Sequence, residues 1–455
     1  MLKGDIFRAY DIRGIYGEDF DDAAAYRIAE AYIALRRKDN DLTQDAPLKI
    51  AVGADMRLSS PQLKAEVIKA LTANGAEVYD LGLLSTPAFY FAVASEKLDG
   101  GIIVSASHNP KNWNGFKVVR AQAVPVSGDS GLLWMRDWIL NEEKLSPRAG
   151  GQVHDLSGSA QKQWEHDQKY FSLENIKAQK IIADPANSMG IQYLDIIAPK
   201  LPGEFIKINS DLDGSFPAHE ADPLKPENLQ QLQAAVLENK ADLGIATDGD
   251  GDRIFFVDEK GQLIEPAIIR GLLARSFLKD KPGAKIGYDV RPGKITEDLI
   301  LASGGQAVLT RVGHSLIKEQ MLKENIYFAG ESSGHFFLNL PLGCFEMPNI
   351  MIMRLLEEFS KAQKPLSEYL EPYRKYYSSG EINCVVADKK AVFNLVAEKY
   401  APGELSFLDG ISVNYPDYWF NVRASNTENK IRLNLEATSP ELLMEKQEEI
   451  LTLLK

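Results

Sequence analysis

Three aspartates alternate with glycines in TDGDGDR, residues 247–253. Carboxylates this close repel one another, so Asp248, Asp250 and Asp252 must be either solvated or neutralised. A divalent cation would neutralise them, and the glycines let the backbone curl so that alternate carboxylates converge. A set of oxygen ligands favours Mg²⁺, Ca²⁺ or Mn²⁺ over Zn²⁺. The spacing predicts a metal-binding loop, and a solvated acidic turn is the simpler alternative.

A calcium loop of the EF-hand type is a second alternative for this stretch. Asp248, Asp250 and Asp252 would fill positions 1, 3 and 5 of such a loop, and Glu259 would fill position 12. Position 6 needs a glycine for the sharp turn and is Arg253 here. The residues that follow also read as a strand and not as a helix, so the pattern disfavours an EF-hand.

A polar cluster, SASHNP, follows an apolar run within residues 101–119. A serine hydroxyl is a poor nucleophile unless it is activated, but it can carry a phosphoryl group. Ser107 is followed by His108 and Asn109, which can donate hydrogen bonds to phosphate oxygens, and Lys117 lies further along. Taken alone, the stretch also fits a strand that ends in a polar Asn-Pro turn.

Several further loops combine a cation with small hydroxyl or amide residues, which suits a phosphate dianion. These loops are FRAYDIRG with Arg8 and Arg13, YDVRPG with Arg291, VGHS with His314 and Ser315, and RASNTEN with Arg423, Ser425, Asn426 and Thr427. GESSGH contains Glu331, Ser333 and His335, and a carboxylate beside a hydroxyl can bind neighbouring sugar hydroxyls. Taken singly, each loop is also consistent with an ordinary turn.

Strands alternating with helices must position these loops. The ranges 48–57, 77–82 and 101–107 read as strands, with helices over 60–76 and 86–98 between them. The same layout follows in AQKIIADPANSMG and ADLGIATDGDGDRIFFV, and again in AKIGYDVRPG, QAVLTRVGHS and NIYFAGESSGH. This alternation predicts α/β layers that occur about three times along the chain.

The C-terminal part has a different pattern. From SSGEINCVV onward the expected order is strand, helix, strand, strand, helix, which predicts an α+β unit. A boundary is expected within 361–377, where prolines and many charges occur.

Length and composition limit the classes of function. The chain has 455 residues, 45% of them hydrophobic, which suits three or four soluble domains. The net charge of −13 argues against nucleic acid as the main partner. No apolar run reaches the roughly 18 residues of a membrane helix, and the N-terminus does not read as a signal peptide. With Cys344 and Cys384 as the only cysteines, we expect a cytoplasmic protein without a disulfide scaffold.

Taken together and in this order, the loops resemble those of the α-D-phosphohexomutases, in particular the bacterial phosphomannomutase/phosphoglucomutase branch. SASHNP and DGDGDR form a specific pair, and the resemblance runs from FRAYDIRG to RASNTE. It implies three topologically similar α/β domains and a C-terminal α+β domain around a central cleft. The expected domains are 1–150 with the phosphoserine loop, 151–256 with the metal loop, 257–368 with the sugar-binding loop and 369–455 with a phosphate-binding loop.

The resemblance also implies a role for each loop. Ser107 would carry the phosphoryl group and would bind Mg²⁺ together with Asp248, Asp250 and Asp252. Catalysis would involve Ser107, His108, Lys117, Arg253, His314 and Arg13. The substrate would be bound by Tyr10, Arg13, Arg291, His314, Glu331, Ser333, His335, Arg423, Ser425, Asn426 and Thr427. Within this set, Glu331 and Ser333 would hold sugar hydroxyls, and the 423–427 loop would hold the phosphate that does not react.

Three positions bear on how closely the chain follows the family. Asn429 stands where members often have proline after Thr427 and Glu428, which should loosen the phosphate loop without removing a donor. Arg291 stands where lysine is common, which keeps the charge but changes its geometry. Ser332 follows Glu331, whereas phosphoglucosamine mutases usually have glutamine there, so the loop is more similar to that of glucose and mannose enzymes.

The implied reaction is the reversible conversion of hexose 1-phosphate and hexose 6-phosphate, for mannose and glucose, through a hexose 1,6-bisphosphate. We expect glucose 1,6-bisphosphate to be an activator and the protein to be a monomer or a weak homo-oligomer. His314 is the expected base, assisted by Arg13 or Lys117. The alternatives are a phosphoglucosamine mutase, an Asp-dependent sugar phosphatase and a metal-binding protein without catalysis.

Overall fold

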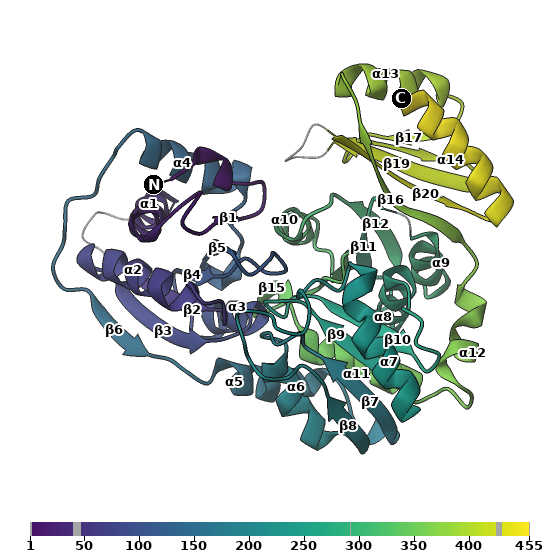
Figure 1. Cartoon of the computed structure of the whole chain (residues 1–455), viewed down its shortest axis with the longest axis horizontal. Coiled ribbons are helices and arrows are strands. Elements are labelled where there is room, and N and C mark those ends of the chain that lie inside the picture. The colour runs from purple at the N-terminus through teal and green to yellow at the C-terminus, as the bar shows by residue number, and fades with distance from the viewer. Residues whose placement is uncertain (1, 40–46, 292, 425–429, 455) are drawn as a thin grey trace. The chain divides into compact units, whose positions relative to one another are not determined.

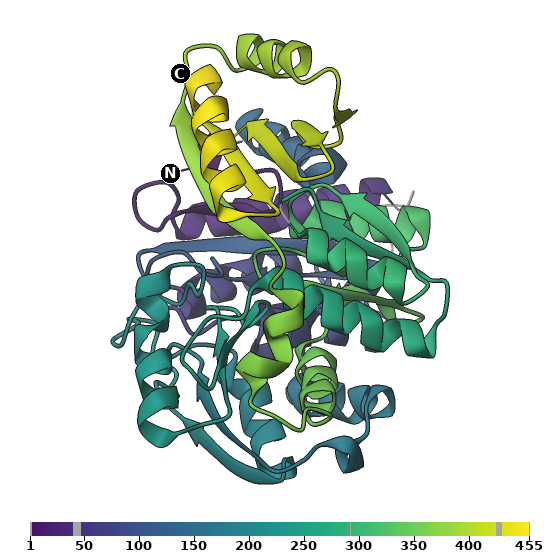
Figure 2. The ribbon, with the colours of Figure 1, turned by 90° about the vertical axis from the view of Figure 1, so that its right-hand side faces the viewer.

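The computed structural model describes residues 2–39, 47–291, 293–424 and 430–454, and the ribbon is drawn in Figure 1 and Figure 2. The chain divides into two compact units. The first unit contains Met1–Ile264 and His335–Leu366, and the second contains Glu265–Gly334 and Ser367–Lys455. None of the helices in the described ranges is both long enough and apolar enough to cross a membrane.

The first unit begins with a six-stranded sheet in the order β1-β5-β4-β2-β3-β6. Its strands are β1 (Ile12–Ile15), β2 (Lys49–Ala54), β3 (Glu77–Leu83), β4 (Gly100–Val104), β5 (Trp113–Arg120) and β6 (Gln152–Asp155). Strand β2 pairs in parallel with β3 and β4, and β5 runs antiparallel to β4. All five residues of β4 are buried, which is typical of a strand covered on both faces.

Four helices accompany this sheet, and proline and serine set where two of them begin. They are α1 (Asp22–Asp39), α2 (Ser60–Ala73), α3 (Thr86–Ser95) and α4 (Leu133–Leu140). Both α2 and α3 have proline in the first turn, where its missing N–H costs nothing. The Ser85 hydroxyl caps α3 by accepting the N–H of Ala88. The strands and helices predicted over 48–107 are therefore confirmed to within a few residues.

A second sheet of the first unit repeats this arrangement in the order β10-β9-β7-β8. Its strands are β7 (Gln179–Asp184), β8 (Gly203–Lys207), β9 (Leu243–Thr247) and β10 (Ile254–Asp258). The helices are α5 (Ser159–Asp167), α6 (Ile191–Ile197) and α7 (Gln230–Asn239). Here β7 pairs in parallel with β8 and β9, and β10 is antiparallel to β9. The order matches β5-β4-β2-β3 of the first sheet, so the predicted repetition of the α/β layout is confirmed.

The first unit also contains a later segment of the chain. A hairpin of β14 (Phe336–Leu340) and β15 (Gly343–Glu346) leads into α11 (Pro348–Phe359). In the hairpin register Phe337 lies opposite Glu346. The sequence reasoning did not predict this hairpin.

The second unit contains a third parallel arrangement. Its strands are β11 (Lys285–Asp289), β12 (Gln306–Thr310) and β13 (Phe328–Gly330), with helices α8 (Pro266–Asp280), α9 (Lys294–Ala302) and α10 (His314–Glu324). Strand β11 pairs in parallel with both β12 and β13. The carboxyl ends of these strands therefore lie at one edge, where ligands of α/β sheets usually bind.

The C-terminal part of the second unit is an antiparallel sheet in the order β16-β20-β19-β18-β17. After the short α12 (Leu366–Leu370), its elements are β16 (Tyr377–Val385), α13 (Lys389–Lys399), β17 (Glu404–Ser406), β18 (Ile411–Asn414), β19 (Tyr418–Ala424), β20 (Lys430–Ala437) and α14 (Pro440–Leu454). Figure 2 shows α14, in yellow, lying along this sheet. The predicted α+β character is confirmed, but the predicted order was incomplete because β17 and β18 are too short to give a clear apolar pattern.

Candidate active site

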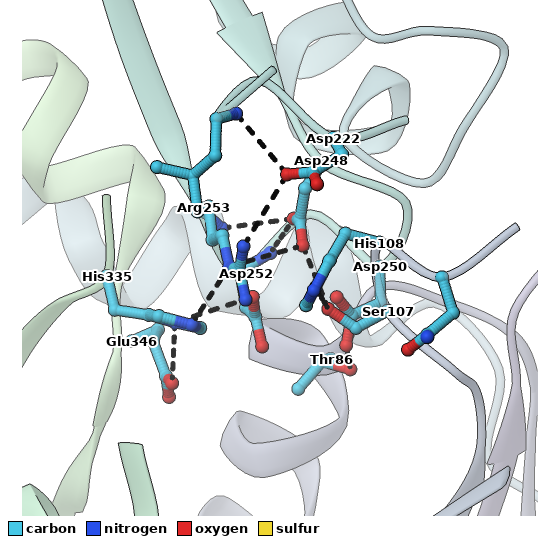
Figure 3. Close-up of polar contacts among 12 residues, drawn as sticks. Thr86, Ser107, His108, Asp222, Asp248, Asp250, Asp252, Arg253, His335 and Glu346 are labelled. Atoms are coloured by element: carbon cyan, nitrogen blue, oxygen red, sulfur yellow. Dashed lines mark hydrogen bonds and ion pairs between the residues drawn. The ribbon is translucent and has the colours of Figure 1, made fainter. Parts of the chain in front are cut away.

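Ser107 lies in a loop that begins where β4 ends. Its side chain is buried, and its backbone has a φ of 51°, an uncommon conformation for a residue with a Cβ. The Ser107 N–H donates to the Ser105 hydroxyl at 3.0 Å. The Ser107 hydroxyl donates to Asp248 Oδ2 at 2.9 Å and lies 3.2 Å from His108 Nδ1 (Figure 3). The loop therefore directs the serine oxygen at the aspartate cluster.

Arg57 holds this loop from behind. Its side chain is fully buried just after β2 and pairs with Asp55, with 3.2 Å between Nε and Oδ2. Its Nη2 donates to the carbonyls of Ser107 at 2.7 Å and Asn109 at 2.5 Å. Its Nη1 donates to the carbonyl of Pro110 at 2.7 Å. One planar guanidinium thus fixes the turn, a task for which a fork of donors is suited.

Arg13, on β1, binds the same loop from another side. Its Nη1 donates to Asn109 Oδ1 at 2.8 Å and to the Ala106 carbonyl at 3.2 Å. Its Nε donates to Asp11 at 2.8 Å. Arg13, predicted as a catalytic and substrate-binding residue, is thus held as a cation beside Ser107.

The three aspartates occupy the loop between β9 and β10, whose ends Thr247 and Ile254 are directly paired. Asp248, Asp250 and Asp252 are all buried, and one carboxylate oxygen from each lies within 4.8 Å of the others. Asp248 Oδ1 closes the loop by accepting the N–H groups of Asp252 and Arg253, each at 3.1 Å. The predicted convergence of the carboxylates is therefore observed.

Gly249 permits the close approach of this loop to the serine loop. A Cβ at this position would lie only 2.2 Å from the Ser107 carbonyl oxygen. Glycine is therefore required here by space.

Lys117 and Thr86 bind the aspartates from the first sheet. Lys117 Nζ lies 2.7 Å from Asp250 Oδ2 and 2.5 Å from Asp252 Oδ2, and its side chain is buried on β5. The Thr86 hydroxyl donates to Asp250 Oδ2 at 2.6 Å, and its N–H donates to the Asp250 carbonyl at 2.9 Å. These contacts join the metal loop to the elements around Ser107.

Mutual repulsion among the buried carboxylates acts most strongly on Asp248. Burial and the charges of Asp252 and Asp250 raise the pKa of Asp248 well above its ordinary value. Burial opposes the charge of Lys117, but Asp250 and Asp252 raise its pKa well above the usual range. Burial and the nearby Arg253 and Arg13 hold the pKa of His108 well below its ordinary value, so its ring is neutral.

These residues fit a hard divalent cation. The donors are oxygens and they converge at one point. Lys117 and Arg253, whose Nε lies 3.8 Å from Asp248 Oδ2, do not fully offset three carboxylates. Asp250 Oδ1 is buried and accepts no hydrogen bond from any residue within the described ranges. A cation held by Asp248, Asp250, Asp252 and an oxygen on Ser107 would supply both the missing charge and the missing partner.

Arg253 connects the metal loop to the later segment of the first unit. Its Nε donates to His335 Nε2 at 3.1 Å, and its Nη1 lies 3.8 Å from Asp222 Oδ1 (Figure 3). His335 Nδ1 lies 3.4 Å from Asp252 Oδ1 and 3.5 Å from Glu346 Oε1. His335, predicted among the substrate-binding residues, therefore contacts the Arg253 and Asp252 side chains in this unit.

The predicted substrate-binding residues Glu331 and Arg291 meet in the second unit. Arg291 Nη2 lies 3.0 Å from Glu331 Oε1, which also accepts the N–H of Gly313 at 3.0 Å. His314 follows at the start of α10 and is buried, as is Ser333. These loops follow β11, β12 and β13, so the parallel strands bring them to one edge.

The remaining predicted residues are less fully described. Arg423, at the end of β19, forms an ion pair with Glu381. Burial and the charge of the neighbouring Arg291 lower its pKa, because two cations close together repel each other. Tyr10 is half-buried before β1. Ser425, Asn426 and Thr427 lie outside the described residues.

Four residues of the site were missed by sequence reasoning: Arg57, Thr86, Asp222 and Glu346. Arg57 and Thr86 had a readable signal, because they follow the carboxyl ends of two parallel strands of the same sheet as β4. Arg57 follows β2, which lies next to β4, and Thr86 follows β3, which lies next to β2. Glu346 had none, since only the unpredicted β14–β15 hairpin brings it to His335.

Fold and site together define a multi-domain α/β protein with a serine hydroxyl aimed at a buried aspartate cluster. Models of the phosphoglucomutase/phosphomannomutase family match along the whole chain. The α/β/α domains I, II and III match residues 4–132, 163–261 and 266–376, and the C-terminal domain matches residues 381–453.

Individual proteins agree with these matches. The chain is 38% identical to a phosphomannomutase of Escherichia coli over 100% of both chains. It is 37% identical to a phosphomannomutase of Methanocaldococcus jannaschii, covering 99% of this chain and 97% of that protein. A crystal structure of a phosphoglucomutase/phosphomannomutase family protein from Burkholderia thailandensis superposes with a TM-score of 0.88 at 30% identity, covering 100% of this chain and 98% of the other. The chain belongs to the phosphoglucomutase/phosphomannomutase family, the α-D-phosphohexomutases, and is an isomerase.

Proposed function

We propose that the protein interconverts hexose 1-phosphates and hexose 6-phosphates of mannose and glucose, with Ser107 as the phosphoryl carrier. The observation that carries the proposal is the contact of the Ser107 hydroxyl with Asp248 at 2.9 Å inside a buried cluster of carboxylates and cations. Family membership supports the reaction class, and the contacts around Ser107 support the roles that we assign to its residues.

Two phosphoryl groups move between oxygen atoms, one in each step. In the first step the bond between phosphorus and Ser107 Oγ breaks, and a bond forms between phosphorus and the free hydroxyl oxygen of the sugar phosphate. The sugar hydroxyl loses its proton to a base, Ser107 Oγ takes up a proton, and the resulting hexose carries phosphates at both ends. In the second step the bond between the other phosphorus and its sugar oxygen breaks, and a bond forms from that phosphorus to Ser107 Oγ. Ser107 loses its proton and the sugar oxygen takes one up, which regenerates the phosphoserine and releases the isomer.

The residues around Ser107 can stabilise the negative charge on the phosphoryl oxygens during this transfer. Lys117 and Arg13 are held as cations by Asp250, Asp252 and Asp11, and neutral His108 can hydrogen-bond the serine oxygen in either sense. Positioned charges of this kind supply most of what phosphoryl transfer requires. Mg²⁺ held by the three aspartates and Ser107 would act as a Lewis acid on the phosphoryl oxygens.

The second unit supplies the residues that we assign to the sugar. Glu331 accepts hydrogen bonds from sugar hydroxyls, and Ser333 donates to or accepts from them. Arg291 and Arg423, with the 425–427 loop, bind the phosphate that does not react. His314 is assigned as the base that takes the hydroxyl proton. Its position beside Gly313, whose N–H binds Glu331, supports a place next to the sugar.

One assay separates the mutase from its alternatives. The protein is incubated with glucose 1-phosphate, Mg²⁺ and a trace of glucose 1,6-bisphosphate as activator, and the products are resolved. We expect glucose 6-phosphate; free glucose would indicate an Asp-dependent phosphatase, and no product would indicate a metal-binding protein without catalysis. A parallel assay with glucosamine 1-phosphate tests the phosphoglucosamine mutase alternative, in which that sugar would be the preferred substrate.

A further inference from the structure

A buried hydrogen-bonded array centres on Asp289, at the end of β11, which has no role in the proposed reaction. Asp289 is fully buried, and one residue, Val290, separates it from Arg291 along the chain. Its Oδ1 accepts hydrogen bonds from Arg270 Nη1 at 2.8 Å and from the Ser332 hydroxyl at 2.7 Å. Its Oδ2 accepts the Ser332 N–H at 3.2 Å and Arg291 Nε at 2.5 Å.

The array is anchored deep in the second unit. Arg270, on α8, is fully buried, and its Nε donates to the Thr296 hydroxyl at 3.0 Å. The Thr296 hydroxyl in turn donates to the Ala267 carbonyl at 2.7 Å. Arg270 Nη1 also donates to the Gly330 carbonyl at 3.3 Å, directly before Glu331. Helix α8 therefore holds Asp289 and the start of the sugar-binding loop at the same time.

The other end of the array reaches the residues assigned to the substrate. Arg291 Nη2 lies 2.5 Å from Asp289 Oδ2 and 3.0 Å from Glu331 Oε1, so one nitrogen bridges the two carboxylates. Although burial opposes ionisation, Arg291 and Arg270 lower the pKa of Asp289 below its ordinary value. Asp289 is therefore an anion whose oxygens are taken up by protein donors, so it serves as an anchor and not as a ligand for sugar.

We propose that Ser332, Asp289 and Arg270 are positioning residues that hold Arg291, and through it Glu331, in the orientation that binds substrate. The inference rests on the proposed mutase function, because that function assigns Arg291 and Glu331 to the substrate. The proposal assigns Ser332, which lies between Glu331 and Ser333, the role of orienting Asp289. The Ser332 hydroxyl and N–H both bind Asp289, so Ser332 acts on the sugar only through the array.

Because residue 291 is an arginine, the orientation of its side chain must be fixed by its neighbours. A guanidinium binds through a planar fork, so its orientation decides which nitrogen reaches which carboxylate, whereas an ammonium group is a rotating point charge. Asp289 contacts both Nε and Nη2 and so fixes the plane of the Arg291 fork. Ser332 in turn limits how Asp289 can rotate.

The test compares Ser332→Ala with Ser332→Thr, which restores a hydroxyl. Ser276→Ala is the matched control, because Ser276 is buried on the same helix as Arg270 but lies outside the array. We expect Ser332→Ala to raise the KM for glucose 1-phosphate about tenfold, the effect of losing one hydrogen bond to a charged group, with kcat changed less than about twofold. Ser332→Thr should recover a KM within about twofold of the unaltered protein, and Ser276→Ala should leave KM unchanged.

A double-mutant cycle tests whether Ser332 acts through Glu331. If it does, Ser332→Ala added to Glu331→Gln should raise KM by less than about twofold, because the carboxylate that the array orients is already gone. An undiminished effect in the Glu331→Gln background would overturn the inference, and so would an unchanged KM in Ser332→Ala alone. Circular dichroism and thermal unfolding of each variant check that the compared proteins are folded.

The unaltered protein separates this inference from the proposed function. Absence of mutase turnover in the unaltered protein would overturn the proposed function. Normal turnover in the unaltered protein, together with normal KM in Ser332→Ala, would overturn the positioning role alone.

Discussion

At the scale of single residues, Ser107 carries the most direct prediction. A phosphoserine should appear in the intact-protein mass spectrum as a population heavier by one phosphate, and Ser107→Ala should lack it. Ser107→Ala should lose most mutase activity while it stays folded, because one hydroxyl hydrogen bond contributes little to stability. Normal turnover in Ser107→Ala would contradict the carrier role, and phosphopeptide mapping would then test Ser105.

Asp250 tests the metal site with little change of shape. Asp250→Asn removes one ligand charge from the oxygen cluster, so Mg²⁺ affinity and turnover should fall together by about tenfold or more. Titrating Mg²⁺ into the protein measures both activity and the Mg²⁺-dependent rise in unfolding temperature. Asp242→Asn, at an exposed carboxylate before β9, is the control. Undiminished activity in excess chelator would show that no metal is needed.

Arg57 tests whether the serine loop must be held rigidly. Arg57→Lys keeps the charge near Asp55 but loses the fork that binds the carbonyls of Ser107, Asn109 and Pro110. We expect turnover to fall by about tenfold or more and the unfolding temperature to drop by several degrees. Arg136→Lys, on the surface of α4, should change neither quantity. Full activity in Arg57→Lys would mean that the loop keeps its shape without the fork.

At the scale of elements, the loop after β7 supports the metal loop and contains a titratable contact. The Ser188 hydroxyl donates to the Asp248 carbonyl at 2.9 Å. The same loop begins at Asp184, which lies 3.1 Å from His219 Nε2. Burial opposes the charge of His219, but Asp184 and the Glu220 carbonyl raise its pKa above the ordinary value. The His219–Asp184 contact therefore stabilises the fold most when His219 is protonated.

The sign of the pH dependence follows from the raised pKa. The stabilisation is fully present below the unfolded-state pKa of about 6.5 and is lost as the pH rises through the folded-state pKa. His219→Gln should therefore lower the unfolding temperature more at pH 5.5 than at pH 8.5. Thermal unfolding of both proteins across this range measures the difference. An equal difference at both pH values would contradict the assignment.

The elements also show how far sequence reasoning extends. The strands and helices around SASHNP and DGDGDR were predictable, because continuous apolar strands, proline at helix starts and glycine turns are local signals. The meeting of Ser107 with Asp248 was expected only from the family resemblance. The contact of Glu346 with His335 depends on a hairpin register, and the bond from Ser332 to Asp289 depends on tertiary packing, so neither has a local signal.

At the scale of the whole molecule, an acidic chain must bind a dianionic substrate. The net charge of −13 repels phosphate, but salt largely screens this repulsion beyond about 10 Å. The cations are instead gathered locally: Lys117, Arg13 and Arg253 near Ser107 in one unit, and Arg291 and Arg423 in the other. We therefore expect the binding energy for phosphate to come from short contacts with these cations and not from the net charge.

The proposed reaction also limits how strictly the protein can choose its sugar. The substrate must bind in two orientations, once with each end at Ser107. Glucose and mannose differ only at C2, while Glu331 and Ser333 are assigned to hydroxyls that the two sugars share. We expect kcat/KM for glucose 1-phosphate and mannose 1-phosphate to lie within about 1–2 kcal/mol of each other, or within roughly fivefold to thirtyfold. Glu331→Gln should weaken both sugars alike, because the lost acceptor serves hydroxyls common to each. Measuring kcat/KM for both sugars on both proteins decides the point. A preference above about a thousandfold, or a Glu331→Gln protein that loses only one sugar, would mean that another group reads C2.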